Sequence, residues 1–306
     1  MHKSNLFYIF LMFFSLSFVG CKSKQSNNDI NSKTLKMVEI PAIITDQYEA
    51  LQYLSEHYWD NMDFGDTAYL NEKQVLAEQF FQYMNVLQTL PENTKVSSLN
   101  QLTGELLEGD SLVIDRFRQL IEKALYEPNS PYRNEELYIP VLKEFIQSPK
   151  IDTTIRERLA YQLSMTMKNR RGTPAIDFSY EKADRSGGTL YGINSEFVLL
   201  VFIDPDCPSC EVAISDMKAS AVLKEFSKRL KILTLYAGVD HQRWIGWSKT
   251  LSPQWINGYD KKMMIQEGSL YDLRPTPSFY LLDREKVVIL KDAPLERVVG
   301  FLREQK

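Results

Sequence analysis

Two cysteines that lie three positions apart offer the clearest chemistry in this sequence. Cys207 and Cys210 form a C-x-x-C motif, and the apolar run 197–203 precedes them. This run predicts a buried strand, and the pattern that follows predicts a helix, so the motif falls on the turn where the helix begins. A dithiol in that position can alternate between two thiols and a disulfide. We therefore expect a redox-active Cys207–Cys210 disulfide and no separate cofactor.

The third cysteine, Cys21, belongs to an export pattern. Lys3 supplies positive charge near the start, and residues 6–19 are uncharged and rich in Phe and Leu. This run is too short for a typical membrane-spanning helix and predicts a signal peptide over 1–20. Residues 17–21 resemble a bacterial lipobox, in which lipid is attached to the cysteine after cleavage. Ordinary secretion with a free Cys21 is the alternative.

The segment after this cysteine is polar and shows no hydrophobic period, so residues 21–39 are predicted to be a flexible tether. A lipid anchor at Cys21 would place the protein in the cell envelope, facing the periplasm, and Lys22 favours the outer membrane. That compartment is oxidising. A disulfide between Cys207 and Cys210 closes almost no loop, so the motif suits a redox role better than a structural one.

Composition excludes one class of partner and allows two domains. The chain has 306 residues and a net charge of −4, with no basic stripe, so we expect no nucleic-acid partner. The hydrophobic pattern changes near residue 172. Before it, residues 40–171 predict an all-helical domain. Its helices are expected at 46–62, 71–90, 99–107, 110–126, 135–146 and 152–167.

Residues 172–306 predict an α/β domain, because strand and helix patterns alternate there. Gly187-Gly188 is interpreted as a turn. The order of a βαβ unit, a hairpin and a terminal helix matches the thioredoxin fold. Strands are expected at 175–180, 197–204, 231–237, 278–283 and 287–291, and helices at 211–230, 243–251 and 295–303.

At this point the chain resembles the thioredoxin superfamily and, within it, the TlpA/ResA-like membrane-anchored thiol-disulfide oxidoreductases. Cys207-Pro208-Ser209-Cys210 follows the predicted central strand, and Arg274-Pro275-Thr276-Pro277 precedes the predicted hairpin. Segments 255–260 and 270–274 are typical of Gram-negative lipoproteins of this group that carry a helical module of unknown function. Residues 57–60 resemble that module.

The resemblance implies a role for each residue of the motif. Cys207, at the helix start, would attack as a thiolate, and the more buried Cys210 would resolve the mixed disulfide. Pro277 takes the place of the cis-proline of the family, with a trans turn proline as the alternative, and the backbone of Thr276 would pair with an extended substrate. The supporting residues are Pro208, Ser209, Thr276 and Pro277.

The sequence departs from family patterns at two positions. Val201 stands where thioredoxin carries a buried Asp, and Ala213 stands where ResA-like members often carry a Glu. Three nearby carboxylates are expected to raise the pKa of the Cys207 thiol, and no His lies between the cysteines, so a reductase is favoured over a strong oxidant. Those carboxylates belong to Asp204, Asp206 and Glu211.

Other readings of the dithiol fit less well. A zinc site needs about four ligands, and beyond the dithiol the soft candidates are His57 and His241 in different domains, so we expect no metal. A peroxidase of the peroxiredoxin type would have Thr where Asp204 stands. A dithiol used only as scaffold is the third alternative.

Two classes of function remain. The first is a membrane-anchored thiol-disulfide oxidoreductase, most simply a disulfide reductase, that acts on protein or small-molecule disulfides and is re-reduced by an unidentified membrane electron donor. The second is a non-catalytic binding lipoprotein, in which the helical domain recognises a partner and the thioredoxin fold serves as scaffold.

Overall fold

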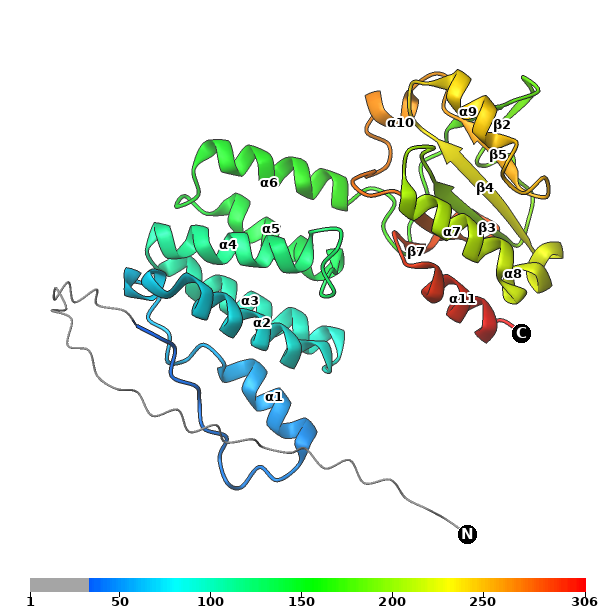
Figure 1. Ribbon diagram of the computed structural model, residues 1–306. Helices are drawn as coiled ribbons and strands as arrows, with labels where there is room; N and C mark the ends of the chain where they lie inside the picture. The colour runs from blue at the N-terminus through cyan, green and yellow to red at the C-terminus, as the bar shows by residue number, and fades with distance from the viewer. Residues whose placement is uncertain (1–32) are drawn as a thin grey trace, which may run out of the picture.

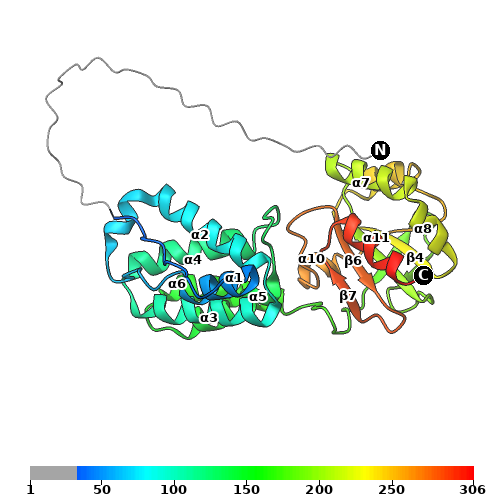
Figure 2. The same cartoon turned by 90° about the horizontal axis from the view of Figure 1, so that it is seen from below.

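The computed structural model describes residues 33–306, so the predicted signal peptide, Cys21 and most of the predicted tether lie outside the described residues. A helical module comes first in the chain and an α/β module second, as the sequence predicts. A short connection after the last helix of the first module joins them (Figure 1). The view from below again shows the modules side by side (Figure 2).

The helical module is a stack of short helices that begin at polar capping residues. The side chains of Asp46, Asp110, Asn134 and Asp152 each accept backbone N–H groups of the first turn that would otherwise lack partners. The elements are α1 (Gln47–His57), η1 (Thr67–Glu72), α2 (Lys73–Gln88), α3 (Glu92–Glu108), α4 (Ser111–Leu125), α5 (Glu135–Gln147) and α6 (Thr153–Thr166).

An aromatic cluster lies at the centre of this module. Phe117 of α4 is completely buried, and its ring centroid lies 5.1 Å from that of Trp59 and 5.4 Å from that of Phe64. Phe80 of α2 packs edge-on against the same ring. Such edge-to-face contacts add to the gain from burying the rings, so this cluster holds α2 and α4 to the segment after α1.

The α/β module is built on a seven-stranded sheet with strand order β2-β1-β5-β4-β3-β6-β7. β3 runs parallel to β4 and antiparallel to β6. The strands are β1 (Ser179–Lys182), β2 (Gly187–Thr189), β3 (Phe197–Phe202), β4 (Leu230–Tyr236), β5 (Ile256–Tyr259), β6 (Ser278–Leu282) and β7 (Val288–Lys291). The helices are α7 (Pro208–Ala219), α8 (Ala221–Glu225), η2 (Phe226–Lys228), α9 (His241–Ser248), α10 (Met264–Glu267) and α11 (Leu295–Glu304).

The central strand β3 is buried on both faces, which explains its unbroken apolar sequence. Leu199 and Val201 pack on the face covered by α7, α8 and α11, which Figure 1 shows lying together across the sheet. Leu200 and Phe202 face the opposite side, where they meet the segment 175–193 and the chain around Tyr271. The alternation follows from the two-residue period of a strand.

Some sequence predictions for this module were wrong. Gly187-Gly188, interpreted as a turn, lies in β2 and pairs with β1. A Cβ at Gly187 would lie 2.5 Å from the carbonyl oxygen of Tyr180, so this pairing requires a residue without a side chain. The strand predicted at 175–180 starts later, at Ser179. The helix predicted at 211–230 breaks at Ser220, whose non-helical backbone ends α7 and whose hydroxyl caps α8.

The predicted tether is also shorter than residues 21–39. Leu35 is buried in the helical core, and its carbonyl accepts a hydrogen bond from Gln79. Lys33 forms an ion pair with Asp66. The chain is therefore attached to the helical module from about residue 33. No helix within residues 33–306 is both long and apolar enough to cross a bilayer.

We predict that Phe117→Ala destabilises the helical module by about 3–5 kcal/mol, because it removes a large buried ring and leaves a cavity. Leu112→Ala on the same helix is the matched control. Leu112 is exposed, so its truncation should change stability by less than about 0.5 kcal/mol. Chemical denaturation of both variants measures the difference, and equal effects would contradict the assignment of Phe117 to the core.

Candidate active site

The dithiol lies at the N-terminus of α7, directly after the turn that follows β3. Cys207 is the N-cap residue of the helix, and Pro208 occupies the first helical position, where its missing N–H breaks no helical hydrogen bond. The backbone N–H of Cys210 donates to Cys207 Sγ at 3.1 Å. The sulfur thus takes the place of a capping oxygen and faces the positive end of the helix.

The two cysteines differ sharply in their surroundings, as predicted. Both are free thiols in this structure; Cys210 is completely buried, whereas Cys207 is half-buried. Burial raises the pKa of Cys210 to about 12. Partial burial also acts to raise the pKa of Cys207, but hydrogen bonds to Cys210 and Ser209 outweigh it, so this pKa lies below its ordinary value. Cys207 is therefore the thiol that ionises first.

The loop before β6 lies opposite the dithiol. The peptide bond between Thr276 and Pro277 is cis, in agreement with the place that the family resemblance gives to Pro277. The carbonyl of Thr276 accepts hydrogen bonds from the Cys207 thiol at 3.2 Å and from the Ser209 hydroxyl at 3.1 Å. Ser209 Oγ also lies 3.0 Å from Cys207 Sγ. The structure thus brings together all six predicted site residues of this module, from two separate segments.

We expected nearby carboxylates to raise the pKa of the Cys207 thiol, but the net shift of this pKa is downward and arises from hydrogen bonds. The pKa of Cys207 is lowered, although Asp204, Asp206 and Glu211 are close in sequence. Of these carboxylates, that of Asp206 forms an ion pair with Arg243, near the start of α9. The sequence analysis did not single out Arg243. The only signal for it was its position as a cationic residue in the first turn of the helix predicted at 243–251. The carboxylate of Asp204 accepts the backbone N–H of Asp206, which orders the turn.

The buried side of the site is apolar. Val201 is completely buried in the same cluster as Cys210, together with Ile214 and Phe279. This environment penalises a charged thiolate and accounts for the raised pKa of the Cys210 thiol. Within residues 33–306, no group of three or more His, Cys, Asp or Glu side chains is placed to hold a metal ion.

Among the described residues, one further candidate, His57, lies apart from the dithiol. His57 belongs to α1 in the helical module. Its ring packs on Tyr53 and pairs with Asp60, so its contacts here are local ones at the surface of the helix. Cys21, the predicted site of lipid attachment, lies outside the described residues.

We predict that Cys207 reacts with iodoacetamide in the folded protein and that Cys210 does not. The reagent attacks thiolates, and the lowered pKa of Cys207 supplies thiolate at a lower pH than an ordinary cysteine would. Peptide mapping by mass spectrometry after labelling at pH 7 separates the two sites. The denatured protein is the control, in which both should react; equal labelling of both in the folded protein would contradict the assignment.

Comparisons with known proteins agree with this architecture. A family model described as a domain of unknown function, DUF5106, matches residues 19–169, which include the helical module. The crystal structure of a thioredoxin-like protein from Bacteroides caccae is 34% identical, with a TM-score of 0.85, over 90% of this chain and 99% of that one. No curated protein matches the chain.

Two further structures match the C-terminal part alone. The C-terminal domain of an uncharacterized protein from Bacteroides fragilis is 40% identical over 44% of this chain and 98% of that one, with a TM-score of 0.44. A domain of a possible thiol-disulfide isomerase from Cytophaga hutchinsonii is 23% identical over 45% of this chain and 95% of that one, with a TM-score of 0.40. Because the likeness to the Bacteroides caccae protein extends over both modules, the chain belongs to the family of thioredoxin-like proteins represented by that structure.

Proposed function

We propose that this protein is a thiol-disulfide oxidoreductase that works as a disulfide reductase. The observation that carries the proposal is the pair of unequal thiols at the start of α7. Cys207 is accessible and has a lowered pKa, whereas Cys210 lies one turn further in, buried, with its pKa raised to about 12. An attacking thiolate next to a protected resolving thiol is the arrangement that disulfide exchange requires.

In the proposed reaction, the Cys207 thiolate attacks one sulfur of a substrate disulfide. The S–S bond of the substrate breaks, a mixed disulfide forms, and one substrate thiolate leaves. Cys210 then gives its proton to that substrate thiolate and attacks Cys207 Sγ, which releases the second substrate sulfur as a thiolate. Two electrons pass to the substrate, and the Cys207–Cys210 pair becomes a disulfide. A membrane-associated dithiol donor returns two electrons and two protons to the pair.

The contacts of Cys207 support the reducing direction. Its sulfur contacts the Cys210 N–H, the Ser209 hydroxyl and the Thr276 carbonyl, all of which are neutral. A strongly oxidising site needs a more stabilised thiolate, such as a neighbouring cation supplies. The nearby cation Arg243 is already paired with Asp206.

We predict that the protein reduces insulin with dithiothreitol as electron donor and that Cys207→Ser abolishes this activity. The redox potential of the pair, measured in glutathione or dithiothreitol buffers, should lie near that of thioredoxin, at about −270 mV. A potential near about −120 mV would point to an oxidase instead, and a dithiol that does not cycle would refute the enzyme proposal.

A cavity in the helical module supports a second candidate function, ligand or partner binding by that module. It has a volume of about 720 Å³ and is lined by both apolar and charged side chains. Phe81 and Leu120 are among the apolar lining residues, and Arg116, Lys123 and Glu127 are among the charged ones. A function of this kind would survive Cys207→Ser, which separates it from dithiol chemistry.

We also propose that lipid on Cys21 holds the protein at the periplasmic side of the cell envelope, at the outer membrane. This rests on the sequence around Cys21. Lys33 is the first residue that the structure describes, and the chain from Cys21 to Lys33 can span at most about 40 Å.

We predict that Cys21→Ser abolishes incorporation of radiolabelled palmitate and moves the protein from the membrane fraction to the soluble fraction. The acyl chains on Cys21 are the proposed anchor, so loss of the attachment site should release the protein completely. Lys22→Ala is the control for a general effect of substitution near the cleavage site. Retained palmitate in the Cys21→Ser variant would disprove the anchor.

A further inference from the structure

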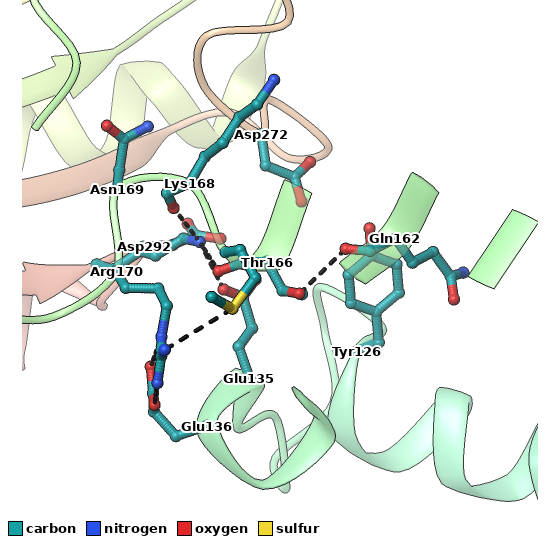
Figure 3. A network of polar contacts seen from close by, with 12 residues as sticks. Tyr126, Glu135, Glu136, Gln162, Thr166, Lys168, Asn169, Arg170, Asp272 and Asp292 are labelled. Carbon is teal, nitrogen blue, oxygen red and sulfur yellow. Dashed lines mark hydrogen bonds and ion pairs between the residues drawn. The ribbon is translucent and has the colours of Figure 1, made fainter. Parts of the chain in front are cut away.

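The loop that carries Thr276 is held from two sides. On one side, the Thr276 carbonyl meets the dithiol. On the other side, the chain before it lies against the helical module, in the polar junction drawn in Figure 3. In this view Tyr126 and Glu135, from the helical module, lie below Asp272 and Asp292, which belong to the α/β module. Asp272 stands four residues before Thr276, so the loop that contacts Cys207 also takes part in this junction.

Arg274 makes the connection between the two sides. It stands two residues before Thr276, and its guanidinium donates to the Tyr126 carbonyl at 2.5 Å and to Glu135 Oε1 at 3.0 Å. The ring of Tyr126 also lies under the guanidinium, 3.6 Å from its centre to Cζ. Asp272 Oδ2 lies 2.7 Å from Nε as an ion pair, but the two atoms do not have the geometry of a hydrogen bond. Only the planar fork of an arginine can make all these contacts together.

Glu135 is itself fixed in place. It is the first residue of α5, and its side chain is only 11% exposed. Besides Arg274, its carboxylate binds Lys291 at 2.7 Å and Arg133 at 3.3 Å. Because three cations converge on one nearly buried carboxylate, the carboxylate has little freedom to move, and neither has the guanidinium bound to it.

Further contacts hold this end of α5 to the α/β module. Lys291 of β7 donates to the backbone carbonyls of Thr166 and Lys168, at the end of α6 and in the connection that follows. Arg133 forms an ion pair with Asp292. These contacts join the two modules on either side of Glu135. The position of the helical module relative to the loop is therefore well defined.

We propose that Glu135 and Tyr126 of the helical module position Thr276 opposite the dithiol through Arg274, so that the helical module builds part of the substrate-binding site. The inference deepens the proposed function and rests on it. In disulfide exchange with a protein, the Thr276 backbone pairs with an extended substrate segment. A loop that is already ordered loses less conformational entropy when the substrate binds. We call the contacts of Arg274 with Tyr126 and Glu135 the clamp. A small disulfide makes no such backbone pairing, so the clamp favours protein substrates.

The test compares Glu135→Ala with Glu136→Ala. Glu136 is the next residue in the same helix turn and binds Arg170 at the junction, but it does not contact Arg274. We expect Glu135→Ala to raise the KM for insulin about tenfold, because the loop must be ordered at each binding event. The rate with the small disulfide 5,5′-dithiobis(2-nitrobenzoate) should stay within about twofold of the unchanged protein. Glu136→Ala should change neither.

A second variant and a second readout keep the test decisive. Arg274→Lys retains the charge but loses the fork, so it should raise the KM for insulin in the same way. Hydrogen–deuterium exchange over residues 272–278 should accelerate in Glu135→Ala and not in Glu136→Ala. Unchanged exchange and KM in both Glu135→Ala and Arg274→Lys, or equal effects of Glu136→Ala, would overturn the inference. If the unchanged protein reduces neither disulfide, the proposed function fails, and hydrogen exchange still decides whether the clamp exists.

Discussion

The pairing of β3 with β6 is the constraint on which the candidate site depends. Phe202, the last residue of β3, lies opposite Ser278, the first residue of β6. Because the two strands are antiparallel, the turn after β3 and the loop before β6 lie at the same end of the strands. Cys207 and Thr276 lie in these segments, 69 positions apart in the chain, yet sulfur and carbonyl oxygen are 3.2 Å apart. Both strands are fully buried, so hydrophobic burial, rather than contacts among the site residues, sets this geometry.

The junction between the modules follows a different logic, because charged side chains form much of it. Removing such groups from water costs free energy that their attraction offsets only when the geometry is good and every charge is paired. Asp292 illustrates the cost: burial raises the pKa of its carboxyl group, and Arg133 opposes that rise. Apolar side chains of similar volume could hold two surfaces together equally well, but in many orientations. We therefore interpret the charges around Glu135 as a means of selecting one orientation, the one in which Arg274 reaches the helical module.

The sequence predicted those features that local patterns encode. Amphipathic helices, the apolar run of β3 and the dithiol at a helix start all have signals within about twenty residues. Features that depend on partners distant in the chain were missed. The strand β5 reads Ile-Asn-Gly-Tyr, a poor strand former that is held by its neighbours β4 and β1. Arg243 and Arg274 look like surface residues in the sequence, and their partners Asp206 and Glu135 lie 37 and 139 positions away. No periodicity or spacing rule links residues across such distances.

The apolar surroundings of Cys210 bear on how this thiol loses its proton. Val201 and Ala213 stand where related proteins carry acidic residues, and the cluster around Cys210 is apolar. A permanent base there would have to be desolvated, at considerable cost, in every state of the protein. The proposed reaction supplies a base of its own, since the attack by Cys207 releases a substrate thiolate next to the site. That thiolate can take the proton of Cys210 at the step where the resolving thiolate is needed. An apolar pocket then keeps Cys210 protonated until a mixed disulfide exists, which protects the reduced site from premature oxidation.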